Sequence, residues 1–180
     1  GAAIDNEALP FMGIVQGEID GIPVMICRLS FSGELAFEVY CGAHHGEAMW
    51  DALIIADQPW NITPYGLEAL GTLRIEKGHV TGAEIDGRTT ARDLHLDWML
   101  SSKKTFVGSA MMDREGLTDE SRWTLVGIKS ANGEKLRGGS HIVASENGNS
   151  PGRSLGHVTA ICYSPELKTY IALALLENGK

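Results

Sequence analysis

The segment from Ser30 to Tyr40 reads SFSGELAFEVY and combines a turn signal with an alternation of apolar residues. Ser32 and Gly33 have the composition of a turn. From Leu35 onward, apolar side chains recur at every second position. This period of two predicts a strand that places Leu35, Phe37 and Val39 on one face and Glu34, Ala36, Glu38 and Tyr40 on the other.

Glu38 lies late in this predicted strand, among aromatic and apolar neighbours. A carboxylate held on a sheet in such surroundings suits a planar ligand with two parallel N–H donors, because a bidentate charge-assisted hydrogen bond fixes the ring. Pterin, purine and guanidinium groups all present such donors. An ordinary solvent-facing strand residue is the alternative, and the residues alone leave both interpretations open.

Hairpin and helix signals flank this segment. Residues 17–21, with the sequence GEIDG, predict a hairpin turn. Residues 46–56 predict a helix with an apolar stripe formed by Met49, Ala52, Leu53 and Ala56. A second helix is predicted to begin at Thr63, with Pro64 in its first turn, and to end at Gly78.

The composition changes near residues 101–105, which are polar and typical of a linker. A short helix is predicted at residues 108–112. Four β-rich runs separated by Gly- and Ser-rich turns follow, at residues 123–128, 141–144, 156–161 and 170–176. We therefore expect an α+β fold with two parts, residues 1–103 and a β part over residues 104–180 whose antiparallel strands form a small sandwich or barrel.

Charge and motif spacing exclude several classes of function. The net charge of -8 disfavours a nucleic-acid partner, whose phosphates require a basic surface. No apolar run reaches the roughly 20 residues that cross a bilayer, so no membrane association is expected. Residues 133–138 have the glycine spacing of a P-loop, but Gly139 and Ser140 follow where Lys and Ser or Thr are required.

The histidines and cysteines predict no metal site. His44 and His45 are adjacent, so their side chains diverge, and no pair of histidines has ligand spacing. The three cysteines, Cys27, Cys41 and Cys162, are widely spaced, which favours free buried thiols in a reducing cytosol. We therefore expect a cytoplasmic location.

Five ordered segments resemble the glycine cleavage T-protein (aminomethyltransferase) family. Residues 30–40 resemble its Y-T-G-E-x-G-x-E strand, and residues 66–78 resemble its G-L-x-A-R-D-x-L-R-L-E-A-G helix. Residues 82–90 are similar to its G-x-E-x-D-x-x-T-x-P segment. Residues 106–108 are similar to the F-I-G that opens its last domain, and residues 156–174 to its closing strands. The resemblance runs in order over nearly the whole chain.

This resemblance implies the C-terminal half of a folate-binding fold that ends in a small β-barrel. It implies that Glu38 holds the pterin ring of tetrahydrofolate and that Phe31 stands where the family has an aromatic Tyr near the folate. A core position in the hairpin is the alternative for Phe31. Leu70 replaces the family Arg that meets the folate tail, and Thr81 and Ala91 replace a Tyr and a Pro. The family's catalytic Asp belongs to the other half, so we assign no catalytic residue.

Within the superfamily, residues 64–79 are most similar to the T-protein-like region of sarcosine oxidase alpha subunits of the heterotetrameric type. The resemblance implies a fragment of an oxidoreductase, inactive alone, whose partners are folate and the other oxidase subunits. It implies that tetrahydrofolate in this region captures the one-carbon unit from sarcosine as 5,10-methylenetetrahydrofolate. It also implies FAD, FMN and NAD in the full complex, none of them bound by this chain.

Four alternatives remain from the sequence. One is a true aminomethyltransferase, which takes its carbon from a lipoyl-bound aminomethyl group. The second is another folate-dependent demethylating enzyme, such as a dimethylglycine dehydrogenase. A non-enzymatic folate-binding relative is the third, and a structural domain with a vestigial pocket is the fourth.

Overall fold

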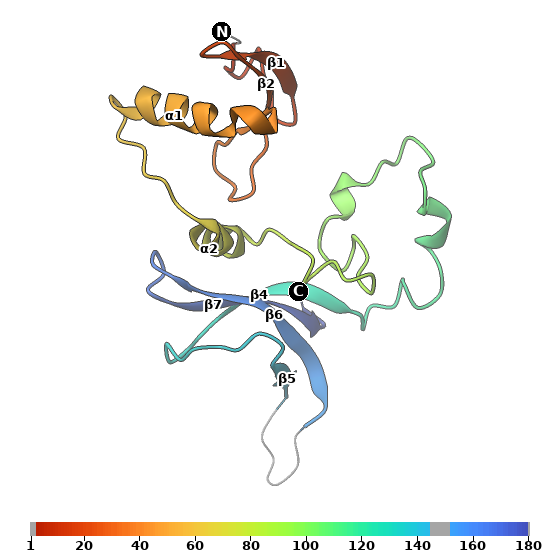
Figure 1. Cartoon of the computed structure of the whole chain (residues 1–180). Coiled ribbons are helices and arrows are strands. Elements are labelled where there is room, and N and C mark those ends of the chain that lie inside the picture. The colour runs from red at the N-terminus through yellow and green to blue at the C-terminus, as the bar shows by residue number, and fades with distance from the viewer. Residues whose placement is uncertain (1–2, 145–151, 180) are drawn as a thin grey trace. The chain divides into compact units, whose positions relative to one another are not determined.

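The computed structural model of the 180-residue chain describes residues 3–144 and 152–179. The chain divides into two compact units, Gly1–Leu70 and Gly71–Lys180, shown in Figure 1. The boundary between the two units, after Leu70, falls inside the helix Leu67–Lys77 and reflects how compact each unit is. The boundary between residues 103 and 104, which separates a folate-binding part from a barrel, is a different kind of division and stays a prediction.

The first unit contains a three-stranded antiparallel sheet in the order β1-β2-β3, with strands Ile14–Ile19, Ile22–Cys27 and Glu38–Cys41. Asp20 and Gly21 join β1 to β2 with φ values of 50° and 75°. Positive φ at both central residues is typical of a type I′ turn, which suits the Asp-Gly pair and the twist of the strands. The hairpin turn predicted at residues 17–21 is confirmed.

One face of this sheet carries the core of the first unit. The buried cluster consists of Leu9, Ile22, Val24, Ile26 and Met49. Met49 comes from α1 (Gly46–Asp57), which follows the short 3-10 helix η1 (Ala43–His45) and lies against the β1–β2 hairpin in Figure 1. The helix is confirmed, but its apolar stripe is only partly buried, because Leu53 remains 41% exposed.

Strand β3 begins three residues later than the alternation of apolar residues predicts. The Leu29 N–H bonds to the carbonyl oxygen of Cys27 at 3.2 Å, so the chain turns away at the end of β2. Because Cys27 is the last residue of β2 and pairs with Glu38, no partner remains on β2 for residues 35–37. Leu35 is consequently 70% exposed and does not share the buried face with Val39.

Helix α2 (Leu67–Lys77) begins later than predicted and ends where predicted. The Leu70 N–H donates to the carbonyl oxygen of Gly66 at 3.1 Å, so the helix starts after Pro64 rather than at it. Gly78 follows the last helical residue with φ of 78°, and its N–H bonds to Ile75. A glycine in this left-handed conformation is a common helix stop, and this part of the prediction is confirmed.

The second unit is built on a four-stranded antiparallel sheet in the order β4-β7-β6-β5. Its strands are β4 (Trp123–Lys129), β5 (His141–Val143), β6 (Ser154–Ser164) and β7 (Thr169–Glu177), and they confirm the four predicted runs. Residues 171–175 of the central strand β7 are all buried, and Ile75 of α2 packs on Ile171 and Leu173. Two short 3-10 helices precede the sheet, η2 (Asp97–Met99) and η3 (Ser109–Met111).

Candidate functional site

The carboxylate predicted to hold a ligand lies at the start of β3. Glu38 is the first residue of this strand, not a late one, and it is exposed. Tyr40 lies on the same face and is 49% exposed, while Val39 between them packs into the core. In the ladder with β2, Glu38 lies opposite Cys27, and Tyr40 lies opposite Met25. The core thus holds the backbone of β3 while both polar side chains stay accessible.

Tyr40 and Glu38 are joined by a hydrogen bond. The Tyr40 hydroxyl donates to Oε2 of Glu38. This bond, assisted by the negative charge of the carboxylate, raises the pKa of Tyr40 above its ordinary value. An ionised carboxylate has about four lone-pair positions, so one bond from Tyr40 leaves room for two further donors. The sequence placed Tyr40 on the face of Glu38 but assigned it no role.

Phe31 lies apart from β3, in the loop between β2 and β3. It is half-buried. Gly33, with φ of 88°, turns this loop, and the Gly33 N–H bonds to Oγ of Ser30 at 2.8 Å. The predicted turn is therefore present, but Phe31 and Glu38 do not share one strand. The contact of Phe31 with folate stays a prediction.

Thr81, one of the departures from the family pattern, serves a buried carboxylate. Its N–H and its hydroxyl both donate to Oε2 of Glu84, at 2.8 and 3.2 Å. Arg74 of α2 donates to the same oxygen at 3.2 Å. Glu84 is 0% exposed, and its Oε1 has no hydrogen-bond partner among the residues described. Sequence reasoning missed this network, because the spacing of Arg74 and Glu84 matches no motif.

A second buried network ties the 88–95 loop to the start of β4. Asp93 is 3% exposed and accepts hydrogen bonds from Nε and Nη2 of Arg122, the shortest at 2.7 Å. Arg122 also donates to the carbonyl oxygens of Arg88 and Gly116. Burial alone would raise the pKa of Asp93, but the bonds from Arg122 and Thr90 outweigh it and lower the pKa.

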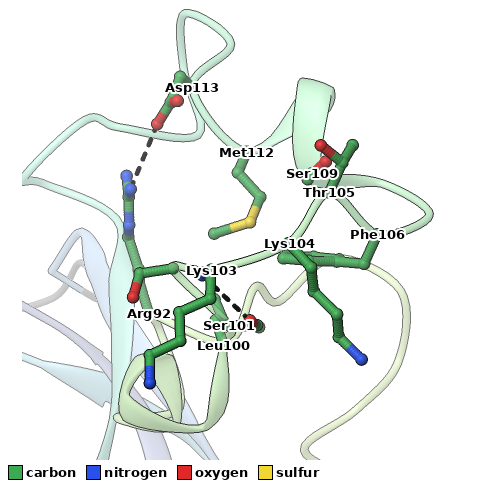
Figure 2. A pocket seen from close by; sticks show the side chains of 11 residues that line it. Arg92, Leu100, Ser101, Lys103, Lys104, Thr105, Phe106, Ser109, Met112 and Asp113 are labelled. Atoms are coloured by element: carbon green, nitrogen blue, oxygen red, sulfur yellow. Dashed lines mark hydrogen bonds and ion pairs between the residues drawn. The ribbon is translucent and has the colours of Figure 1, made fainter.

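The second unit contains a pocket of about 390 Å³ beside residues 100–106. Figure 2 shows that its cationic side chains diverge: Lys103 and Lys104 point in different directions, and Arg92 is directed toward Asp113. The Arg92–Asp113 ion pair measures 3.2 Å. Because these cations do not converge, they do not form a shared binding site for one anion.

Within residues 3–144 and 152–179, no group of three His, Cys, Asp or Glu side chains is placed to hold a metal ion. All three cysteines are free; Cys27 is buried, and Cys41 and Cys162 are half-buried. Among the helices of the described ranges, none has the length and apolar character that a membrane span requires.

Two family matches cover most of the chain. Residues 1–104 match the GCVT N-terminal domain, and residues 124–180 match the glycine cleavage T-protein C-terminal barrel domain. A solved structure, that of the glycine cleavage system aminomethyltransferase T from Bartonella henselae, superposes with a TM-score of 0.77 over 97% of this chain and 46% of that one, at 25% identity. These matches confirm the expected T-protein fold.

Sarcosine oxidase alpha subunits are among the curated relatives. The protein from Rhizobium meliloti is 43% identical over 98% of this chain, and that from Corynebacterium sp. (strain U-96) is 38% identical over the same share. An aminomethyltransferase from Halothermothrix orenii is 30% identical over 99% of the chain. The chain spans 18–19% of the length of these oxidase subunits and 49% of the aminomethyltransferase. The chain belongs to the glycine cleavage T-protein family, as a homologue of the T-protein-like region of sarcosine oxidase alpha subunits.

Proposed function

We propose that this chain is the tetrahydrofolate-binding region of a sarcosine oxidase alpha subunit. In this proposal, the one-carbon unit from oxidative demethylation of sarcosine is captured here as 5,10-methylenetetrahydrofolate. The support is the identity of 43% to an oxidase subunit over nearly the whole chain, against 30% to an aminomethyltransferase over a similar length. We assign the oxidation, with its FAD, FMN and NAD, to parts of the complex outside this chain.

The accessible carboxylate of Glu38 is the observation that carries the proposal. It stands at the position of the pterin-holding carboxylate in the family pattern and projects from a sheet whose opposite face is packed. Its oxygens can accept two parallel N–H donors from one edge of a pterin ring, and such a bidentate, charge-assisted pair of hydrogen bonds is strong and fixes the orientation of the ring. The residues present therefore fit the group that the family binds.

When bound, tetrahydrofolate supplies N5 and N10 as the acceptors of the one-carbon unit. The task of this chain is to hold the ring in place. Glu38 fixes the pterin edge, and Phe31 offers an aromatic face to the ligand. Holding an acceptor beside a reactive one-carbon species replaces a bimolecular encounter and limits the escape of free formaldehyde.

We expect the substitution Glu38→Gln to weaken binding of a reduced folate at least tenfold. The amide retains the shape of the side chain but loses the charge and one acceptor, and hydrogen bonds to a charged group contribute roughly 1.5–3 kcal/mol. The measurement is a calorimetric titration of the chain and of the variant with 5-formyltetrahydrofolate, the air-stable reduced folate.

Glu34→Gln is the matched control, because Glu34 is an exposed glutamate of the preceding loop. It should bind folate as the unmodified chain does. Equal affinities for all three proteins would remove Glu38 from the pterin site. No saturable binding by the unmodified chain would contradict the proposal that these residues hold the ring.

The family fold also supports a second function, that of an aminomethyltransferase. The matching solved structure carries that name, and relatives with that name match the chain at 30–36% identity. Both functions use a tetrahydrofolate site, so Glu38 does not separate them. Transfer of carbon from an aminomethylated lipoyl protein, assayed on the full-length protein, would favour this second function over sarcosine oxidation.

A further inference from the structure

Tyr40 shares the exposed face of β3 with Glu38, and its hydroxyl donates to Oε2 of that carboxylate. We propose that Tyr40 is a positioning residue, which orients the Glu38 carboxylate so that its other acceptor positions face the pterin ring. This inference rests on the proposed folate site and adds a residue that determines the affinity of the site.

Apart from the bond from Tyr40, the exposed position of Glu38 does little to restrict the rotation of its side chain. It is the first residue of a short strand, it is exposed, and the loop before it makes no ladder bonds to β2. A glutamate side chain has several accessible rotamers, and fixing one of them upon ligand binding costs conformational entropy. A bond that fixes the rotamer beforehand removes part of this cost from the binding step.

The alternation of the strand sets the distance for this bond. Residues two apart on a strand point to the same side, so the ring of Tyr40 extends beside the side chain of Glu38. Across the ladder, Met25 lies directly opposite Tyr40 and is 36% exposed. Side chains directly opposite one another in an antiparallel ladder lie close enough to pack, so this register places Met25 beside the ring of Tyr40.

The hydroxyl remains a donor throughout the neutral pH range. Its bond to Glu38 and the nearby negative charge raise the pKa of Tyr40, so the phenol stays protonated. The single bond occupies one of about four lone-pair positions of the carboxylate. Two pterin N–H groups can therefore bind while Tyr40 stays in place.

The experiment is a double-mutant cycle on folate affinity with Tyr40→Phe and Glu38→Gln, alone and combined. Phe retains the ring and loses only the hydroxyl. We expect Tyr40→Phe to weaken binding of 5-formyltetrahydrofolate roughly threefold to tenfold with Glu38 present, and less than twofold in the Glu38→Gln background. Tyr163→Phe is the matched control, because Tyr163 lies on β6 and is also 49% exposed.

A loss of folate affinity of the same size in both backgrounds, or no loss in either, would overturn the positioning role, since the effect of a merely structural tyrosine does not depend on the carboxylate.

A second experiment tests the Tyr40–Glu38 pair itself. It is the pH titration of Tyr40, followed by NMR of ¹³Cζ-labelled tyrosine without folate. Glu38→Gln should shift this titration to lower pH, and an unchanged titration would overturn the inference even if folate binds. Absence of folate binding alongside a shifted titration would instead refute the proposed function, and the ligand role of Tyr40 with it.

Discussion

We expect the substitution Gly156→Ala to lower the free energy of unfolding by about 3 kcal/mol, because a Cβ atom has no room at this position. Gly156 is buried in β6 and pairs with Ile142 of β5 and Leu176 of β7. An ideal Cβ would lie 2.0 Å from the carbonyl oxygen of Leu175 and 2.9 Å from the Cα of Leu176. Both are backbone atoms of the central strand, so the overlap can be relieved only if β6 and β7 move apart.

Gly127→Ala is the matched control for this substitution. Gly127 also lies in a strand, β4, but it is exposed, and a Cβ there would have no neighbour within 4 Å. Both substitutions reduce the entropy of the unfolded chain equally, and at the open position this effect is neutral or slightly stabilising. Urea unfolding followed by circular dichroism measures the difference, and similar midpoints for the two variants would show that the sheet adjusts at little cost.

Elements whose ends depend on local chemistry could be predicted from the sequence. The Asp20–Gly21 turn was predictable because the conformation needs two residues that tolerate positive φ, and these two do. The end of α2 at Gly78 follows the same reasoning. The four strands of the second unit were predictable because each β-rich run is bounded by turn residues. In all these cases, the deciding interaction lies within a few residues of the signal.

Elements whose ends depend on a distant partner could not be predicted. Alternation suggests that β3 begins at Leu35, but a strand needs a neighbour, and β2 ends opposite Glu38. The later start of α2 is a separate case: the Thr63–Pro64 pair has the chemistry of a helix start, yet the first helical hydrogen bond is the local one from Leu70 to Gly66. No tertiary contact among the described residues explains this difference. For β3, the pairing with β2 is decisive. Local propensity proposes a boundary, and tertiary pairing decides whether the chain uses it.

The candidate site shows the same distinction. The common face of Glu38 and Tyr40 follows from a period of two and was predictable. The ion pair of Asp93 with Arg122 was not predictable, because Arg122 comes from a segment far along the chain. Only the local half of that network left a signal: Thr90 and Asp93 have capping-box spacing, and each binds the backbone N–H of the other.

Asp93→Asn is the second substitution with a large expected effect, a loss of about 3 kcal/mol of unfolding free energy at pH 7. Asparagine offers one acceptor oxygen where Arg122 and Thr90 use both carboxylate oxygens, and its amide group would face other donors. Removing one partner of a buried ion pair lowers the free energy of unfolding by about 3–5 kcal/mol. We expect the lower end, because the Arg122 side chain is 23% exposed and water can reach it.

Asp113→Asn is the matched control, because its ion pair with Arg92 joins side chains that are 80% and 47% exposed. Such surface pairs contribute about 0–1 kcal/mol. A loss for Asp93→Asn no larger than for this control would show that the Asp93–Arg122 pair does not hold the 88–95 loop.

The dependence of this loss on pH is the sharper test. The pKa of Asp93 is lowered in the folded chain, so its contribution is complete above the ordinary value near 4 and is lost as pH falls through the lower folded pKa. The pKa values of Asp5, Asp86 and Asp119 are lowered too, but these residues are common to both proteins and cancel in the difference. The measurement is urea unfolding from pH 7 to pH 2. The difference in the free energy of unfolding between the unmodified chain and Asp93→Asn should stay constant down to about pH 5 and then become smaller. A difference that stays constant to pH 2 would mean that the folded chain does not prefer the ionised form of Asp93.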